Sequence, residues 1–310
     1  MKRFLVVVIV IIQLSIIIYL AGVINYKLKA KGPISLKKIE KKDYLRESTQ
    51  ELPFFYEPTA NHIIVSNPDW LTYTTKQTIN SDSLNERYNY PIITDNTHFR
   101  IIILGDSFTG AYVNTSENWT ELLEDYLNQH NVCKNITKYE VINLGVDGYD
   151  LAYETERFEK RGIKYNPDLV ILLVTDILRL QDYRLAHQKK YSEKEMSDFK
   201  KKGIYYPGFD ADSTLPDVYR LEYQEKQFRR LFSLYSGPLL LVDHEKNDKA
   251  SDFFLHISST NPKLTYIKTD HNIYEKSISL PDGHPNKEGH FALMKDIAKQ
   301  LSQKQLLPCR

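Results

Sequence analysis

The distribution of apolar residues divides the chain into an apolar N-terminal stretch, a polar connector and a long segment in which strand-like and helix-like patterns alternate. Residues 4–24 are apolar apart from Gln13, Ser15 and a few small residues, close to the ~20 residues that a helix needs to cross a bilayer. The alternative, a cleavable signal peptide, has an apolar core of only about 7 to 15 residues, and no small-x-small cleavage site follows Leu20. We therefore expect a transmembrane anchor over residues 1–25.

The rest of the chain has the pattern of a stalk followed by one folded domain. Residues 26–51 are rich in lysine and lack apolar periodicity, which predicts a solvated linker, and the domain is expected over residues 52–310. The lead-in of this domain shows no regular pattern and is expected to be irregular. After it, five apolar, β-branched runs predict strands at 99–104, 139–144, 169–174, 238–243 and 264–268.

Helical periodicity recurs between the predicted strands. Apolar residues spaced three and four apart occur at 119–127, 151–162, 218–235 and 291–301. Ser116 is the expected N-cap of the first of these helices, and the polar stretch 179–216 is expected to be a surface insertion beside the site. Strands that alternate with helices predict parallel βαβ units. The expected fold class is therefore α/β, a three-layer α/β/α sandwich with a mostly parallel five-stranded sheet, preceded by one N-terminal transmembrane helix.

The charge and cysteine content argue against several classes of function. Lysine and arginine number 41 and aspartate and glutamate 40, and the net charge of +1 provides no basic footprint for a nucleic acid. The two cysteines, Cys133 and Cys309, form no CxxC pair, and no histidine stands at a spacing suited to zinc. We expect neither a metal nor another cofactor, and the sequence leaves open whether the two cysteines pair.

Three segments with chemical potential follow predicted strands or precede the last helix. Ser107 ends a Gly-Asp-Ser segment after the first strand, where its hydroxyl can reach the sheet edge but needs a base to become nucleophilic. Gly148 follows the second strand, and a glycine there allows a backbone N–H to approach a reacting oxygen. Asp282 and His284 precede the last helix at a spacing that lets the carboxylate orient the imidazole. Taken singly, each segment is equally well explained as a cap or a turn.

The order of these segments along the chain resembles the GDSL/SGNH hydrolase family. The resemblance covers roughly residues 99–301, and the lead-in is similar to that of bacterial membrane-anchored members. It implies the three-layer fold and an ester or acyl-transfer chemistry, with Ser107 as nucleophile, His284 as general base and Asp282 as its orienting partner. It also implies that the backbone N–H groups of Ser107 and Gly148 belong to an oxyanion hole.

One position departs from the family pattern. The family usually carries an asparagine followed by an aspartate after the third strand, whereas this chain has Val-Thr-Asp at 174–176. Thr175 is the expected third oxyanion donor, with a shorter reach than an amide and a proton that can rotate away. Loss of such a donor typically costs about 10² to 10³ in rate. His244, His271 and His290 are interpreted as packing or solvated residues.

Together with the resemblance, the sequence predicts a serine esterase that hydrolyses O-acyl or O-acetyl groups on cell-surface carbohydrate by a Ser-His-Asp mechanism. Two alternatives stay open: an O-acyltransferase that uses the same site on a surface polysaccharide, and a catalytically silent glycan-binding protein. The expected partners are an ester-bearing substrate, such as an acylated glycan, and the membrane. Surface-glycan chemistry places the catalytic domain of this single-pass protein outside the cytoplasm, although the lysines after the span favour the cytoplasmic side.

Overall fold

The computed structural model describes residues 37–38, 44–46, 49, 52, 55–68, 71–110, 112–180, 194, 216–245, 250–269 and 275–308. The predicted membrane span at residues 1–25 lies outside these residues, as do most of the predicted stalk and most of the predicted insertion. Within the described part of the chain, no helix is long and apolar enough to cross a bilayer.

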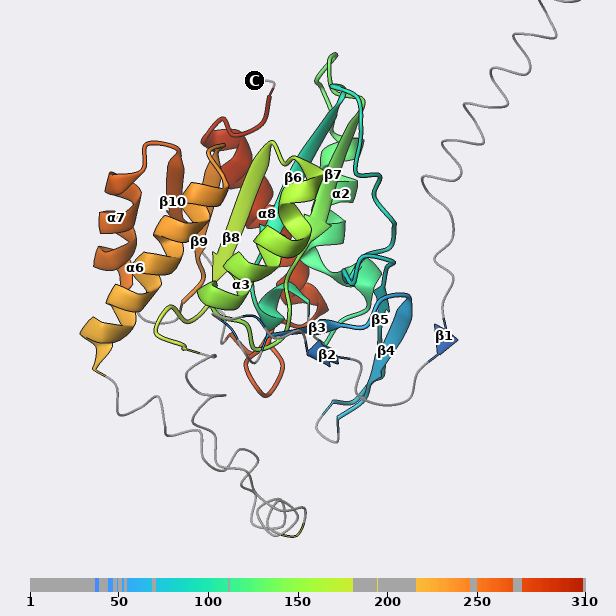
Figure 1. Cartoon of the computed structure of the whole chain (residues 1–310). Helices are drawn as coiled ribbons and strands as arrows, with labels where there is room; N and C mark the ends of the chain where they lie inside the picture. Colours follow the sequence, from blue (N-terminus) through green and yellow to red (C-terminus); the bar gives the residue numbers. More distant parts are fainter. Residues whose placement is uncertain are drawn as a thin grey trace, which may run out of the picture.

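A five-stranded parallel sheet lies at the centre of the domain, in the order β10-β9-β8-β6-β7 (Figure 1). Its strands are β6 (His98–Leu104), β7 (Lys138–Asn143), β8 (Leu169–Val174), β9 (Leu239–Asp243) and β10 (Leu264–Lys268). The five predicted strands are thus confirmed to within one residue. Because β6 is the first of these five strands in the chain yet lies between β7 and β8, the order reverses beside it, and ligands of open α/β sheets bind at such a point.

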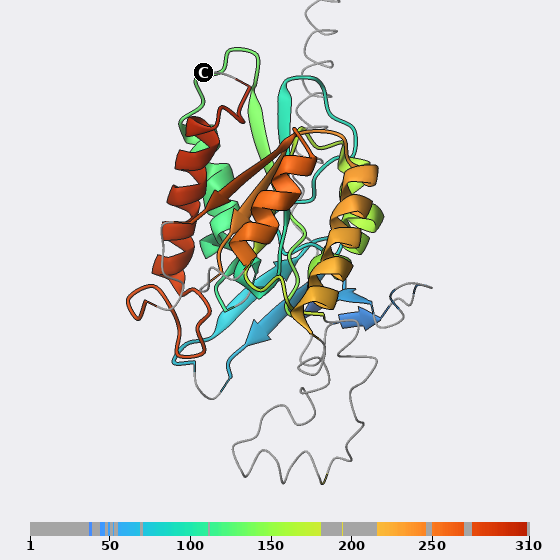
Figure 2. The same cartoon turned by 90° about the vertical axis from the view of Figure 1, so that its left-hand side faces the viewer.

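Helices cover both faces of the sheet and give the predicted three layers (Figure 2). They are α2 (Trp119–Gln129), α3 (Leu151–Arg157), α6 (Asp217–Leu234), α7 (Ser251–Thr260) and α8 (Lys287–Gln303). Ile101 and Ile103 of β6 lie in a core with α2 and α8. Ile102 and Leu104 lie in a second core with α3, α6 and α7. Since successive side chains of a strand point to opposite faces, one continuous apolar run supplies both cores.

The helix boundaries differ from the sequence prediction in two places. The N-cap of α2 is Asn118, whose side chain accepts a hydrogen bond from the N–H of Thr120 at 3.1 Å, so the prediction of Ser116 is wrong. Ser116 instead lies inside a short 3₁₀ turn, Thr115–Glu117, that leads into the helix. The predicted helix at 151–162 continues beyond α3 as a π turn, Phe158–Gly162. A further 3₁₀ turn follows at Ile163–Tyr165.

The described residues before β6 contain five short strands in two small sheets, two within the predicted stalk at 26–51 and three within the lead-in that was expected to be irregular. These strands are β1 (Lys37–Lys38), β2 (Tyr44–Arg46), β3 (Tyr56–Pro58), β4 (His62–Ser66) and β5 (Thr75–Ile79). Strands β4 and β5 form an antiparallel pair, and both views place them at the end of the domain to which the sheet strands point (Figures 1 and 2). The lead-in therefore lies at the edge of the sheet where the strand-end segments meet.

Cys133 lies between α2 and β7 and is disulfide-bonded, which the sequence left open. Its side chain is buried, with 6% of its surface exposed. Cys309, the other cysteine of the sequence, lies outside the described residues.

Candidate active site

Ser107 stands at the start of a tight turn directly after the central strand β6. The turn is a short 3₁₀ helix, Ser107–Thr109, and Asp106 caps it by accepting a hydrogen bond from the N–H of Phe108 at 2.9 Å. Gly105 makes the turn possible, because a Cβ there would clash with the Thr109 hydroxyl and come within 3.3 Å of the Leu173 carbonyl oxygen. The serine is thereby held at the carboxyl edge of the sheet.

His284 and Asp282 approach Ser107 from the loop before α8. Nε2 of His284 lies 2.7 Å from Oγ of Ser107, and Nδ1 lies 2.8 Å from Oδ2 of Asp282. Asn286 caps α8 by accepting from the N–H of Gly289, and Gly283 adopts a φ of 93° that turns the loop back. The structure thus brings together the three residues predicted as the catalytic set, in an order that lets His284 accept the serine proton while Asp282 holds the ring. Their catalytic role stays a prediction.

Two aromatic rings pack against the His284 imidazole. The ring of Phe108 is tilted over it at a centroid distance of 5.1 Å, and the ring of Tyr112 meets it edge-on at 4.8 Å. Tyr112 has a φ of 60°, which is costly for a bulky side chain. The Tyr73 hydroxyl donates to the Tyr112 carbonyl oxygen at 3.2 Å. Sequence reasoning missed both tyrosines, since no local pattern signals their approach to the site.

The two predicted backbone donors of the oxyanion hole are both unengaged. Gly148 has a φ of 80° and follows β7, and Ser107 follows β6. In the described part of the chain, neither N–H donates a hydrogen bond, so both are available to an acceptor. The neighbouring Asp147 adds a second carboxylate near His284. Burial raises the pKa of Asp147 to about 6, an effect that His284 opposes and Asp106 reinforces.

Thr175 does not point its proton toward the space beside Ser107. Its hydroxyl donates to Oδ2 of Asp106 at 2.6 Å, and a threonine has only one such proton. The hydroxyl is thus engaged with Asp106, and the predicted role of Thr175 as an oxyanion donor stays a prediction. The same Asp106 oxygen accepts from Nη1 of Arg179 at 2.9 Å. Arg179 falls at the start of the predicted surface insertion, and sequence reasoning missed it.

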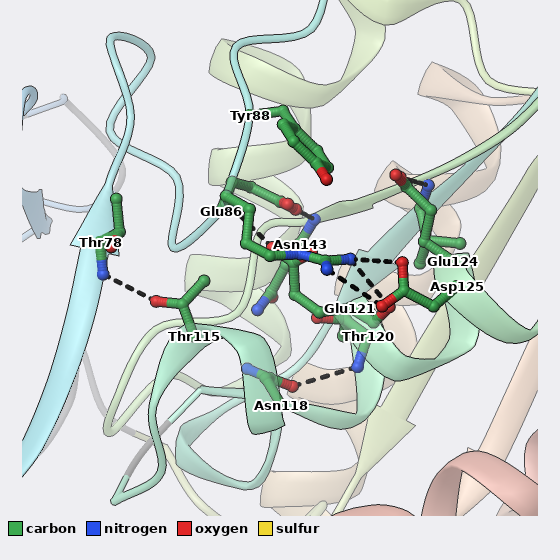
Figure 3. A network of polar contacts seen from close by, with 12 residues as sticks. Thr78, Glu86, Tyr88, Thr115, Asn118, Thr120, Glu121, Glu124, Asp125 and Asn143 are labelled. Atoms are coloured by element: carbon green, nitrogen blue, oxygen red, sulfur yellow. Dashed lines mark hydrogen bonds and ion pairs between the residues drawn. The ribbon is translucent and has the colours of Figure 1, made fainter. Parts of the chain in front are cut away.

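A buried polar network behind the turn at Ser107–Thr109 joins the lead-in to α2 and β7 (Figure 3). Glu86 accepts from the N–H of Asn143, and burial together with Glu121 raises the pKa of Glu86 well above its usual value. Asn143 in turn donates through Nδ2 to the Thr109 carbonyl oxygen at 3.0 Å and accepts from the N–H of Gly145 at 2.8 Å. The Asn143 side chain thus fixes both the turn that ends at Thr109 and the loop that begins at Gly145 relative to β7.

The lead-in, through β5 and the segment after it, contacts the other side of the turn at Ser107–Thr109. The side-chain amides of Gln77 and Asn85 both donate to the Gly110 carbonyl oxygen, the latter at 3.2 Å. The N–H groups of Lys76 and Thr78 on β5 bond to side chains of the segment that follows this glycine. The lead-in is therefore a support for the site, which an irregular segment would not provide.

The other histidines considered from the sequence lie elsewhere. His244 is buried, contacts the Thr269 hydroxyl through Nδ1 at 2.7 Å and faces the ring of Phe108. His290 is fully buried in α8 and accepts from the Trp119 N–H. His271 lies outside the described residues. Among the described residues, no group of three or more His, Cys, Asp or Glu side chains is placed to hold a metal ion.

No family model matches the sequence, and no curated protein shows significant similarity to it. Solved structures similar to this chain include a protein of the G-D-S-L family from Desulfitobacterium hafniense, at 16% identity and a TM-score of 0.42, covering 65% of this chain and 98% of that one. An esterase from Pseudoalteromonas sp. is 17% identical with a TM-score of 0.43, covering 67% of this chain and 100% of that one. An acetylxylan esterase from Geobacillus stearothermophilus is 15% identical with a TM-score of 0.40, covering 67% of this chain and 96% of that one.

One of these solved structures is of a protein described as belonging to the G-D-S-L family, which the strand-end segments resemble. At identities of 15–17% and TM-scores no higher than 0.43, the likeness leaves the activity of this chain to be judged from its own site.

Proposed function

We propose that this chain is a serine esterase with Ser107 as its nucleophile. The observation that carries the proposal is the continuous series of contacts from Ser107 Oγ to His284 Nε2 at 2.7 Å and from His284 Nδ1 to Asp282 Oδ2 at 2.8 Å. In the tautomer that fits both contacts, Nδ1–H donates to the carboxylate and Nε2 accepts the serine proton. A cap or a turn would need neither contact.

The proposed reaction proceeds in two steps through an acyl-serine. His284 removes the proton of Ser107 as the oxygen attacks the ester carbonyl, and the developing oxyanion accepts from the N–H groups of Ser107 and Gly148. The imidazolium then protonates the leaving alcohol, and Asp282 stabilises its charge. Water attacks the acyl-serine in the second step with His284 again acting as the base, and the imidazolium then returns the proton to Ser107 Oγ as the carboxylic acid leaves.

The proposed substrate is a carbohydrate that carries O-acyl groups such as acetyl. Support comes from Tyr112 beside the imidazole and from Tyr73, which bonds it, because the apolar face of a sugar ring packs well on an aromatic side chain. Tyr73 is 41% exposed and is joined to Tyr112, so it offers such a surface within the site. One of the three similar solved structures described above is an acetylxylan esterase.

The test is turnover of an aryl acetate and of an O-acetylated oligosaccharide by the purified full chain in detergent. Wild type is expected to release acetate from both, and Ser107→Ala to reduce release to background because the acyl-enzyme cannot form. Ser233→Ala, a serine of α6 that bonds the Arg230 carbonyl oxygen, is the matched control and should retain full activity. Acetylated sugar in place of free acetate would assign acyl transfer, and no turnover of either substrate would refute the proposal.

We further propose that the folded domain works outside the cytoplasm, tethered by the N-terminal segment. The disulfide at Cys133 supports this location, because such bonds persist in oxidising compartments and are rare in the cytosol. This agrees with the expectation from surface-glycan chemistry and opposes the one from the lysines after the span. Thiol labelling of denatured protein from cells should require a reductant, and labelling without a reductant would place the domain in the cytoplasm.

A further inference from the structure

Arg179 contacts both loops that flank the nucleophile. Its Nη1 donates to Oδ2 of Asp106 at 2.9 Å and to the carbonyl oxygen of Tyr149 at 3.2 Å. Asp106 directly precedes Ser107, and Tyr149 directly follows Gly148. Nη1 of Arg179 thus links the neighbour of Ser107 to the neighbour of Gly148, the two residues whose backbone N–H groups are unengaged.

The Asp106 carboxylate is the fixed point of this arrangement. It is 3% exposed, and its Oδ1 accepts from the N–H of Phe108 while Oδ2 accepts from Arg179 and from the Thr175 hydroxyl. A buried carboxylate with three donors is held in one position, because each lost contact leaves a charge without compensation. The backbone of Ser107 is therefore set by two side chains from the loop after β8.

The charges around Arg179 leave its guanidinium firmly protonated. Asp106 and Asp176 face it, with Nε of Arg179 lying 3.8 Å from Oδ2 of Asp176, and the carboxylate of Asp150 lies nearby. These charges outweigh burial and raise the pKa of Arg179. Because these carboxylates compensate its charge, the guanidinium, whose side chain is only 21% exposed, acts as a fixed bridge between the two loops.

We propose that Arg179 is a positioning residue of the oxyanion hole, one that sets the separation of the Ser107 and Gly148 N–H groups, with Thr175 assisting through Asp106. This inference rests on the proposed esterase function. It gives Thr175 a role other than the direct donation that the sequence predicted, because its hydroxyl bonds Asp106. The two side chains support the donors indirectly, because Thr175 bonds Asp106 and Arg179 bonds Asp106 and Tyr149.

The experiment is steady-state kinetics on an aryl acetate with full-length wild type, Arg179→Met, Arg179→Lys, Thr175→Val and the double variant Arg179→Met/Thr175→Val. Arg179→Met should lower kcat by about 10- to 10²-fold with KM within about threefold, since misplaced donors weaken only the transition state. Arg179→Lys should fall about tenfold, because one ammonium lacks the planar fork of a guanidinium. Thr175→Val should have a smaller effect, and the double variant should fall less than the two single effects combined, because both act on Asp106.

Arg220→Met is the matched control. Arg220 lies on α6, and its side chain is 12% exposed. It donates to the carbonyl oxygen of Leu178, which precedes Arg179 in the loop after β8, and none of its contacts among the described residues is with Asp106. It should retain wild-type kcat. If circular dichroism shows that Arg179→Met does not fold, kcat and KM of Arg179→Lys and Thr175→Val are compared with wild type instead, provided that both variants keep the wild-type Tm.

The outcomes separate the two proposals. Wild-type kcat in a folded Arg179→Met, or in both Arg179→Lys and Thr175→Val, overturns the inference and leaves the esterase proposal intact. A raised KM at unchanged kcat also overturns it, since Arg179 would then bind substrate. An inert wild type refutes the esterase proposal and the inference with it.

Discussion

Replacing Asp282 with asparagine tests how His284 is held. Oδ2 of Asp282 lies 2.8 Å from Nδ1 of the imidazole, and Oδ1 accepts from the His284 backbone N–H at 3.2 Å. In Asp282→Asn the amide oxygen can keep the backbone contact, which turns the amide NH₂ toward Nδ1. Nδ1 then becomes an acceptor and Nε2 carries the proton. In that tautomer His284 cannot accept the proton of Ser107.

The size of the effect follows from the environment of the pair. A wrong tautomer in a buried Ser-His-Asp site costs about 10⁴ in kcat. Here the side chain of Asp282 is 29% exposed, and Phe108 and Tyr112 hold the imidazole independently of the acid. We therefore expect a smaller loss, about 10²- to 10³-fold in kcat, or ~3 to 4 kcal/mol at ~1.4 kcal/mol per factor of ten.

The assay is hydrolysis of an aryl acetate by the full chain, with KM measured alongside kcat. KM should change little, because the proton is accepted only as the bond forms. Glu275→Gln is the matched control: Glu275 belongs to the same loop, and its carboxylate accepts from the Ser277 hydroxyl at 2.7 Å, away from the imidazole. Asp282→Asn with more than a tenth of wild-type kcat would refute the orienting role of Asp282.

Three further predictions concern the surroundings of the site. Burial raises the pKa of Glu245 to about 7, above its usual value, so the fold prefers the protonated form and loses stability as pH rises from about 4.5 to 7. In urea unfolding, the free energy of unfolding of Glu245→Gln minus that of wild type should therefore be larger at pH 8 than at pH 5, by on the order of 2 kcal/mol. The same difference at both pH values would contradict this. Tyr112→Gly should keep or raise Tm, because the φ of 60° costs about 1 to 2 kcal/mol, while kcat falls; an unchanged kcat would show that the ring does not hold His284. Gln77→Ala should lower the free energy of unfolding by about 0.5 to 1.5 kcal/mol, since the Gly110 carbonyl oxygen loses one of its two side-chain donors, and an unchanged unfolding midpoint would argue against this support.

The sheet was predictable because its strands are buried on both faces. Runs such as Leu169–Val174 are apolar at every position, a pattern that is recognisable without neighbours. Strand β5, with the sequence TKQTI, was missed because its residues are mostly polar. Its role comes from hydrogen bonds to a loop more than thirty residues away, such as that from Gln77 to Gly110, which no local pattern records. Helix α7 was missed for a related reason, because it ends in a run of serine and threonine that favours a loop.

The site divides in the same way. Ser107, Asp282 and His284 were found because each stands at a strand end or before a helix in a characteristic order. The direction of the Thr175 hydroxyl could not be predicted, because it depends on Asp106, which is distant in sequence and close only after folding. Arg179 was hidden in a polar segment whose composition indicates a surface loop. Its importance becomes visible only when its contacts with both flanking loops are known.

The most direct test of the account is covalent labelling of the full-length protein with a fluorophosphonate, which reacts with activated serines, followed by mass spectrometry of the labelled peptide. We expect one modified serine, Ser107, with labelling slowed strongly in His284→Ala and absent in Ser107→Ala. Labelling of another serine, or none in a folded wild-type protein, would contradict the claim that Ser107 is an activated nucleophile.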